Sequence, residues 1–469
     1  MSNKYAELMD RRGLILRRAL GIDYESFERG PIEFDYDGLL AASGLSLADV
    51  ARIQHDRGVG RTPMLELRSI TELVRSVSAP GHGARIFVKD EAANPSGSFK
   101  DRRAALSAYF AAQRGYAGIV AATSGNYGAA VASQAAQSGL QSIIVQEAFD
   151  SRGVGQPEIL EKARKCEALG AQALQTTVGP ELFYMLLSVL EETGFFNASL
   201  YTPMSIQGIE TLGHEIVEDI RAIAGREPAL ILGTHAGGGM CTGVARGVRA
   251  AGADTQVVAV SVDLSGLHMA SDNQFNRKSF TTGHTGFSMP FTAWPDRVDV
   301  PRNAARPLRY LDRFVTVTQG AVFYATEVLA QLEGLERGPA GNTSLAAALV
   351  IARELPSDEI LVISETEYTG AGKTPWAQLE FARSLGVEVT AGQGAGVPGE
   401  SIVLPLGVAD LAVTEVPLDR LRASYVRTAA GTVDRPLTAA EIEFLAEDCR
   451  TDADSVRAVL DDQLSGSPA

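Results

Sequence analysis

Short apolar runs alternate with segments of helical spacing through the middle of the chain. The apolar runs, which predict buried strands, cover residues 84–90, 117–124, 141–146, 229–235, 255–263 and 358–365. Helical spacing follows over residues 99–115, 126–139, 157–170, from 240 onward, and 343–356. Strands that alternate with helices in this way predict an α/β fold with a mainly parallel, doubly wound sheet covered by helices on both faces.

Both ends of the chain and one internal segment lack this alternation. Residues 1–60 have the pattern of helices and loops, and we expect an N-terminal helical extension there. Between about residues 263 and 318 the pattern breaks into an irregular insert that carries His, Pro and Arg. After about residue 390 the chain is glycine-rich, then strand-like at SIVLPLG, then polar and helical, which predicts a C-terminal extension over residues 391–469.

The composition is that of a soluble globular protein, with 45% hydrophobic and 21% charged residues. Lys and Arg number 42 against 57 Asp and Glu, so the formal net charge of −15 argues against a nucleic-acid or anionic-membrane binder. The first residues lack the apolar core of a signal peptide, and no apolar run is long enough to cross a bilayer. The three cysteines are far apart and have neither a disulfide framework nor metal-site spacing. We therefore expect a cytoplasmic protein without a metal site.

Three loops of unusual composition follow predicted strands and lead into predicted helices. They are NPSGSFK at residues 94–100, TSGNYG at 123–128 and HAGGGMCTG at 235–243. In open α/β sheets, ligands bind at this edge. The consecutive glycines of the third loop let main-chain amides close around a phosphate at a helix N-terminus, and Thr242 offers a hydroxyl. The loop lacks the spacing of a Walker or dinucleotide-binding motif, and close packing is the alternative explanation.

Together, the three loops resemble those of the fold-type II enzymes that use pyridoxal 5′-phosphate, such as threonine synthase, cysteine synthase and the tryptophan synthase β chain. The resemblance covers about residues 61–384. It implies two doubly wound, parallel-sheet subdomains with the cofactor between them. The large subdomain would comprise residues 61–97 and 200–390, and the small one residues 98–199.

The resemblance also implies roles for individual residues. Lys100 would form the Schiff base with the cofactor, and Asn126 would contact the hydroxyl of the cofactor ring. Thr123, Ser124 and Tyr127 would flank the carboxylate of the substrate. The amides that bind the phosphate would come from Gly237, Gly238, Gly239, Met240 and Cys241.

Lys100 must be neutral to attack an aldehyde, so we expect a partly desolvated pocket that lowers its pKa. The nitrogen of the cofactor ring needs a partner, for which the segment VISETEYTGAGK is the candidate. A hydroxyl, from Thr366 or Ser364, would leave this nitrogen largely unprotonated. A carboxylate, from Glu365 or Glu367, would protonate it. Fold-type II enzymes usually use a hydroxyl, which favours Thr366 and leaves Glu365 as the alternative.

Longer segments narrow the resemblance to one family. NPSGSFKDRRAA, AATSGNYGAAVASQAA, GLHMASDNQFN, TTGHTGF and ETEYTGAGK resemble the cofactor-binding β subunits of 2-amino-4-oxopentanoate thiolases, and the likeness runs to about Pro405. This family implies cleavage of 2-amino-4-oxopentanoate by coenzyme A to acetyl-CoA and D-alanine, in ornithine breakdown. It also implies a separate small α subunit, and we expect a homodimer of this chain within a hetero-oligomer.

The thiolase reaction needs a donor for the oxyanion at C4 of the substrate, and His235, His284 and the expected substrate-binding residue Gln207 are the candidates. Ordinary thiolases use a cysteine, but Cys166 and Cys241 are better explained as packing residues. Some basic residues could hold the phosphates of coenzyme A, although salt bridges are their more common role: Arg277, Lys278, Arg302, Arg306, Arg309 and Arg313.

Two other interpretations stay open. A threonine synthase, or another replacement or elimination enzyme for a small amino acid, carries a similar lysine loop. O-phosphohomoserine would need a second phosphate pocket, which only the scattered arginines suggest. A cofactor-binding scaffold or regulatory subunit is the second alternative, and the presence of Lys100 argues against it.

Overall fold

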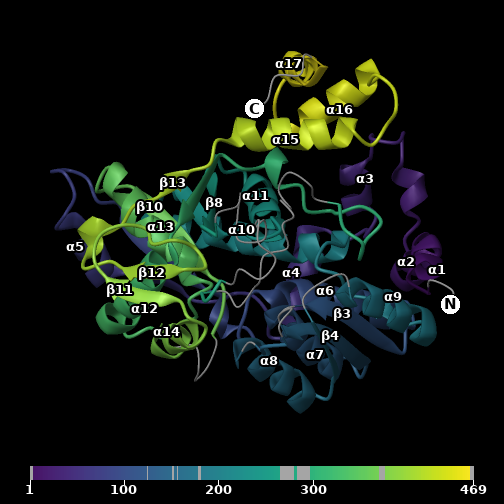
Figure 1. The fold of residues 1–469 in the computed structure, drawn as a ribbon, viewed down its shortest axis with the longest axis horizontal. Helices are drawn as coiled ribbons and strands as arrows, with labels where there is room; N and C mark the ends of the chain where they lie inside the picture. Colours follow the sequence, from purple (N-terminus) through teal and green to yellow (C-terminus); the bar gives the residue numbers. More distant parts are fainter. Residues whose placement is uncertain are drawn as a thin grey trace.

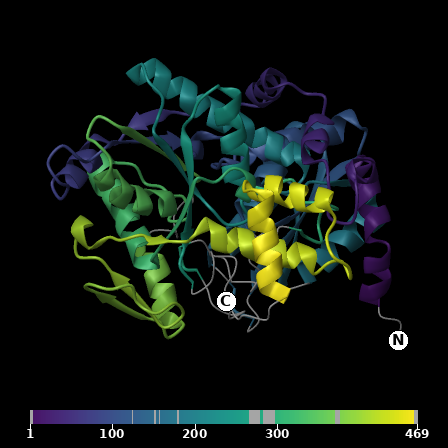
Figure 2. The same ribbon diagram turned by 90° about the horizontal axis from the view of Figure 1, so that it is seen from above.

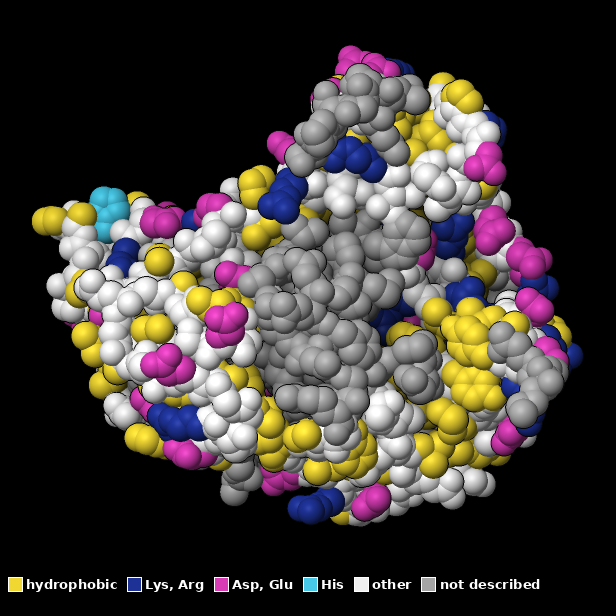
Figure 3. All heavy atoms as spheres, in the orientation of Figure 1, with side chains coloured by type: hydrophobic (Ala, Val, Ile, Leu, Met, Phe, Trp, Pro, Cys, Tyr) yellow, Lys and Arg dark blue, Asp and Glu magenta, His cyan; other side chains and the backbone are white. Residues whose placement is uncertain are grey.

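Figure 1 shows the computed structural model of the protein, which describes residues 4–123, 125–149, 153–155, 157–177, 181–264, 279–281, 296–368 and 375–464. Two main sheets organise the chain, and a two-stranded sheet lies near its C-terminal part. On the face shown in Figure 3, acidic and basic side chains of the described residues are interspersed. None of the helices in these ranges combines the length and the hydrophobicity of a membrane span.

The smaller main sheet has the strand order β5-β4-β3-β6, and its neighbouring strands pair in parallel. Its strands are β3 (Gly118–Thr123), β4 (Gln141–Phe149), β5 (Gln172–Thr177) and β6 (Phe196–Asn197). The helices around it are α6 (Lys100–Gln113), α7 (Asn126–Gln137), α8 (Pro157–Ala168) and α9 (Glu181–Thr193). The sequence pattern did not predict β5, because this edge strand is mostly polar and has no fully buried residue.

The larger sheet has the strand order β1-β2-β10-β7-β8-β9-β13 in the described residues. Its strands are β1 (Met64–Glu66), β2 (Arg85–Asp90), β7 (Leu230–Thr234), β8 (Gln256–Val262), β9 (Arg313–Val317), β10 (Ile360–Glu365) and β13 (Thr414–Glu415). The inner strands pair in parallel, and only the edge strands β1 and β13 are antiparallel to their neighbours. The predicted mainly parallel α/β fold is confirmed. Since β13 follows residue 390, the sheet extends into the segment expected to be a separate C-terminal extension.

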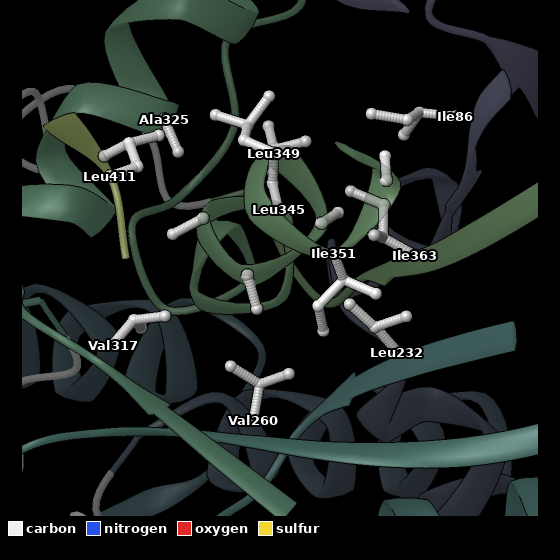
Figure 4. Close-up of a cluster of buried hydrophobic side chains, with 14 of the residues drawn as sticks. Ile86, Leu232, Val260, Val317, Ala325, Leu345, Leu349, Ile351, Ile363 and Leu411 are labelled. Atoms are coloured by element: carbon white, nitrogen blue, oxygen red, sulfur yellow. The ribbon is translucent and has the colours of Figure 1, made fainter. Parts of the chain in front are cut away.

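Successive side chains of the larger sheet point to two different hydrophobic cores. Ile86 and Val88 of β2 face one core, and Phe87 between them faces the other. The helices on the first face are α5 (Arg68–Arg75), α12 (Gln319–Glu333) and α13 (Asn342–Ile351), and those on the second are α10 (Pro203–Ala224) and α11 (Gly239–Ala250). In Figure 4, Leu345 and Leu349 of α13 lie in the first core, among side chains of the neighbouring helices and strands. Helices on both faces therefore hold the strand ends in place.

The N-terminal segment packs on the smaller sheet. Its helices are α1 (Lys4–Asp10), α2 (Arg12–Leu20), α3 (Tyr36–Ala41) and α4 (Leu47–His55), with the 3₁₀ turn η1 (Tyr24–Phe27). Leu39 and Val50 join the core that α6 and α7 form on one face of this sheet. Ile15 and Leu16 join the core on the opposite face, with α9. The segment is therefore part of the body that carries the smaller sheet.

The C-terminal helices α15 (Leu418–Ala430), α16 (Ala439–Cys449) and α17 (Ala453–Leu464) lie together at one side of the molecule, in yellow in Figures 1 and 2. Leu421 and Leu445 complete the core around α10 and α11. Asp448 of α16 accepts hydrogen bonds from Arg309 at 2.7 Å and from the Tyr425 hydroxyl at 2.6 Å. The remaining elements are α14 (Pro375–Ser384), β11 (Glu388–Ala391), β12 (Ser401–Leu404), η2 (Glu91–Ala93), η3 (Pro307–Arg309), η4 (Ala352–Glu354) and η5 (Val408–Asp410).

Candidate active site

A cavity of about 170 Å³ lies where loops at the carboxyl ends of strands from both main sheets meet. Its lining comes from the start of α6, the β3–α7 loop, α8, the β7–α11 loop and the segment after β10. In open α/β sheets ligands bind at this edge. The three loops of unusual composition therefore meet in one cavity.

Two larger hollows, of about 680 and 730 Å³, lie between the N-terminal segment and the C-terminal helices. Their charged side chains include ion pairs, such as Arg246 with Glu210 at 2.5 Å. Neither hollow is lined by Lys100 or by the glycine-rich loop. The smaller cavity is therefore the candidate active site.

Lys100 is the first residue of α6, at the end of the loop that follows β2 and η2. This loop is hydrogen-bonded to the segment after β10: the Phe99 N–H donates to the Thr366 carbonyl at 3.0 Å, and the Tyr368 N–H donates to the Gly97 carbonyl at 2.8 Å. Gly97 has a φ of 80°, a conformation that side chains disfavour. The small residues of the loop thus allow it to hold Lys100 beside the segment that was expected to meet the cofactor ring.

Lys100 is half-buried as a residue, and its Nζ lies 4.4 Å from the centre of the Phe99 ring. Desolvation lowers the pKa of Lys100 well below 10.5, and the charge of Arg103 lowers it further, while Glu367 acts in the opposite direction. A lowered pKa increases the neutral fraction of the amine, which is the form that attacks a carbonyl carbon. Lys100 therefore has the environment of a nucleophilic lysine.

The second loop joins β3 to α7. Thr123 ends the strand, and its Oγ1 accepts a hydrogen bond from the Gly125 N–H at 3.0 Å. Asn126 begins the helix, and Thr123, Asn126 and Tyr127 all line the cavity. The Tyr127 hydroxyl is 3.4 Å from Ser107 Oγ. Ser124, which was expected to bind the substrate, lies outside the described residues.

The third loop is a cradle that has no space for side chains. An ideal Cβ at Gly237, Gly238 or Gly239 would lie 1.9, 2.5 or 2.4 Å from the nearest atom, in Tyr201, Pro307 and Arg103 respectively. Real Cβ atoms do not approach other heavy atoms so closely. Only glycine fits at Gly238, which has a φ of 80° and lies against the Pro307 ring, whereas a Cβ at Gly237 or Gly239 would displace the end of a side chain. The main chain itself therefore faces the cavity.

The main chain of this loop offers hydrogen-bond donors. The first hydrogen bond within α11 runs from the Thr242 N–H to the Gly238 carbonyl, at 3.0 Å. The amides of Gly239, Met240 and Cys241 precede it and have no acceptor within the helix. Amides at a helix N-terminus, with the helix dipole behind them, bind anions such as phosphate. The cradle therefore fits the phosphate of pyridoxal 5′-phosphate.

The side chains of Cys241 and Thr242 do not line the cavity. Cys241 Sγ lies 3.9 Å from the Gly233 carbonyl, and the Thr242 hydroxyl donates to the Gly238 carbonyl at 2.9 Å. Cys241 can thus serve the phosphate only through its amide. Burial raises the pKa of Cys241 and of Cys166 to about 12, so both thiols are protonated packing groups.

Of the four candidate partners of the ring nitrogen, Thr366 and Glu367 line the cavity, whereas Ser364 and Glu365 do not. The Glu367 carboxylate lies 3.6 Å from Lys162 Nζ. The Glu365 carboxyl packs against Gly341, where a Cβ would lie 1.8 Å from Oε1. Burial, followed by the nearby carboxylates of Glu367 and Asp90, raises the pKa of Glu365 well above 4.5. This placement favours Thr366.

Two of the residues considered as donors to the C4 oxyanion, Gln207 and His235, are described by the structure, and neither lines the cavity. Gln207 donates from Nε2 to the Leu45 carbonyl at 3.0 Å. His235 is buried behind the loop, with its ring centre 5.0 Å from that of Phe314, and desolvation lowers its pKa to about 3. His284 lies outside the described residues. Among the described residues, neither Gln207 nor His235 is therefore placed to donate to the oxyanion.

The described arginines that were considered for coenzyme A are engaged in ion pairs within the chain. The pairs are Arg302–Asp296 at 3.4 Å, Arg306–Asp448, Arg309–Asp448 at 2.7 Å and Arg313–Glu354 at 3.0 Å. Salt bridges, the more common role for such residues, therefore account for all four. Arg277 and Lys278 lie outside the described residues.

Lys162 is a cavity residue that the sequence did not reveal. It lies on α8, and its Nζ is 2.7 Å from Glu158 and 3.6 Å from Glu367. In the sequence it is one of several charged residues on an amphipathic helix. Its nearness to Glu367 depends on how α8 packs against the end of β10, which no local pattern encodes.

Comparison with known proteins agrees with this geometry. A family model described as pyridoxal-phosphate dependent enzyme matches residues 55–365. A 2-amino-4-ketopentanoate thiolase beta subunit from an unknown prokaryotic organism is 62% identical over 461 residues, which is 98% of each chain. The beta subunit from Acetoanaerobium sticklandii is 57% identical over 97% of this chain and 98% of its own. The chain belongs to the thiolase β-subunit family of pyridoxal-phosphate dependent enzymes.

Solved structures show the same fold. A threonine deaminase from T.th. is 26% identical and covers 68% of this chain and 98% of its own, with a TM-score of 0.52. Maize serine racemase is 24% identical and covers 71% of this chain and 98% of its own, with a TM-score of 0.54. The predicted fold-type II architecture is confirmed. The protein is therefore an enzyme whose cofactor is pyridoxal 5′-phosphate, and its β-subunit family implies a separate partner subunit.

Proposed function

We propose that this chain is the catalytic β subunit of an enzyme that cleaves 2-amino-4-oxopentanoate with coenzyme A to acetyl-CoA and D-alanine. The observation that carries the proposal is the meeting of Lys100, the asparagine loop and the glycine cradle in one cavity, within a chain 62% identical to a thiolase β subunit. The threonine synthases from Halalkalibacterium halodurans and Bacillus sp. match only 19% and 18% of this chain, so they favour the alternative much less.

Pyridoxal phosphate, when bound, supplies an electron sink for negative charge on the carbons of the amino-acid substrate. Gly239, Met240 and Cys241 would hold its phosphate through their amides. Asn126 would contact the ring hydroxyl, and Thr366 the ring nitrogen. These assignments rest on the lining of the cavity and on the free amides of the cradle.

Lys100 would bind the cofactor covalently and then act as an acid and base. A lysine with a lowered pKa can accept a proton near neutral pH and return it, so it can move protons between carbons of the substrate. Thr123, Tyr127 and Ser124 would position the substrate carboxylate at the start of α7.

Lys162 is our candidate for the oxyanion donor, in place of Gln207 and His235. It is a cation of the cavity that lies next to the asparagine loop: a Cβ on Gly125 would lie 3.1 Å from its Nζ. A positioned cation stabilises negative charge that develops on a carbonyl oxygen during thiolate attack. Glu367 and Glu158 would fix the ammonium group in place.

The partner would be a small α subunit, and two copies of this chain would form a homodimer at the centre of the assembly. Coenzyme A would bind at a place other than the four arginines that are held in ion pairs, which are Arg302, Arg306, Arg309 and Arg313. We also place the enzyme in the cytoplasm, since its three cysteines are free and buried, as in a reducing compartment.

The experiment is a thiolase assay with the purified chain, with and without a candidate α subunit. Formation of acetyl-CoA from 2-amino-4-oxopentanoate and coenzyme A, together with D-alanine, is the expected result, and Lys162→Met should lower kcat more than it raises KM. O-phosphohomoserine serves as the control substrate. Release of phosphate from this control without any acetyl-CoA formation would replace the proposal by the threonine synthase alternative.

A further inference from the structure

Arg103 lies one helical turn after Lys100 and lines the same cavity. Its side chain is 2% exposed. Nη1 donates to the Leu200 carbonyl at 2.7 Å, and Nε has no hydrogen-bond partner in the described part of the chain. A buried guanidinium with an unused donor is costly unless another group accepts from it.

Arg103 also differs from its neighbour in its ion pairs. Arg102 is paired with Glu91 at 2.7 Å and with Glu215 at 2.8 Å. Among the described residues no carboxylate pairs with Arg103, and its guanidinium lies over the Phe99 ring at 5.7 Å. Desolvation lowers the pKa of Arg103 to about 10, so it remains a cation at neutral pH. A buried cation of this kind is stabilised by an anion.

The guanidinium of Arg103 lies directly against the glycine cradle. An ideal Cβ on Gly239 would be 2.4 Å from Nη2 and 2.9 Å from Nη1. The amides of Gly239, Met240 and Cys241, which have no acceptor within the helix, are on the same short segment. The unpaired cation and the free amides thus belong to one anion site.

We propose that Arg103 binds the phosphate of the cofactor, together with the amides of the cradle. Arginine suits this role because its planar, permanently charged group can donate more than one hydrogen bond to a phosphate. The proposal rests on the assignment of pyridoxal phosphate as the cofactor. It adds a cation from the lysine helix to a site that otherwise consists of main-chain donors.

The test compares two ligands that differ only in the phosphate. Pyridoxal phosphate and pyridoxal are each titrated into the full chain, and their capture by Lys100 is followed by visible absorbance. Arg103→Met should weaken the binding of pyridoxal phosphate about 10- to 100-fold more than that of pyridoxal, the effect of one hydrogen bond to a charged group. Arg103→Lys, which keeps the positive charge, should lose less affinity for pyridoxal phosphate than Arg103→Met does.

Arg114→Met is the matched control. Arg114 follows the last residue of the same helix, is exposed and donates to the Leu20 carbonyl, outside the cavity. The Arg114→Met variant should bind both ligands with the affinities of the unmodified chain. Equal losses for the two ligands, or no loss in Arg103→Met, would overturn the proposal. If Arg103→Met does not fold, the affinities of Arg103→Lys for pyridoxal phosphate and pyridoxal are compared in the same way, and the same outcomes apply. An unmodified chain that captures neither ligand would instead refute the cofactor assignment.

Discussion

Replacing Gly238 by alanine should weaken the binding of pyridoxal phosphate at least about 30-fold. Gly238 has a φ of 80°, and an ideal Cβ there would lie 2.5 Å from Cγ of Pro307. A left-handed conformation costs an alanine about 1–2 kcal/mol, and an overpacked methyl group costs about 1–3 kcal/mol more. The cradle conformation therefore becomes about 2–5 kcal/mol less favourable. The altered loop relaxes away from Pro307, and binding of the phosphate must then restore it.

The assay is an absorbance titration of the full chain, combined with urea unfolding. Gly225→Ala is the control, because Gly225 has a φ of 69° but no atom within 4 Å of its ideal Cβ. It should lose about 1–2 kcal/mol of stability and keep its affinity for the cofactor. Unchanged affinity in Gly238→Ala, or an equal loss of affinity in Gly225→Ala, would refute the view that the cradle is a close-fitting phosphate site.

Other predictions concern the lysine, a buried ion pair and the core. Lys100→Ala should show only the spectrum of unreacted pyridoxal phosphate, and full thiolase turnover in this variant would overturn the role of the lysine. Because burial lowers the pKa of Lys100, its rate of cofactor capture in stopped-flow absorbance should hold its plateau to well below pH 10.5; a decline that begins near pH 10.5 would contradict this. Although burial alone would raise the pKa of Glu215, the charge of Arg102 lowers it to about 2 from 4.5. The pair therefore contributes about 3 kcal/mol of stability above pH 4.5, which is lost as the pH falls toward 2. Glu215→Gln should flatten the pH dependence of the free energy of unfolding, measured with urea. An unchanged slope would contradict the assignment of this dependence to the ion pair. Leu345→Ala, at a fully buried position of α13, should cost about 2–5 kcal/mol of stability in the same assay, and a loss below about 1 kcal/mol would show that the core is not closely packed there.

The fold was largely predictable because its central strands are continuous apolar runs. β2, β3, β4, β7, β8 and β10 all coincide with predicted strands, whereas β9 lies in the segment that was expected to be irregular. β5 was missed since this mostly polar edge strand lacks that signal. The edge strand β13 has two residues, too few for any periodic pattern.

The site was predictable where its chemistry is local. Lys100 and the three glycines lie on loops whose composition is unusual by itself. The choice between Thr366 and Glu365 depends on which side chain faces the cavity, and this needs the path of the chain after β10. Lys162 and Arg103 were missed because Glu367 and Gly239, which lie next to them, are far away in the sequence and meet them only in the folded chain.

Reduction with sodium borohydride tests the central claim most directly, because it fixes pyridoxal phosphate to the amine that holds it. Two lysines, Lys100 and Lys162, line the cavity in the described residues. Mass spectrometry of the digested protein should find the pyridoxyl group on the peptide that contains Lys100. A label on Lys162, or no label after saturation with the cofactor, would contradict the account.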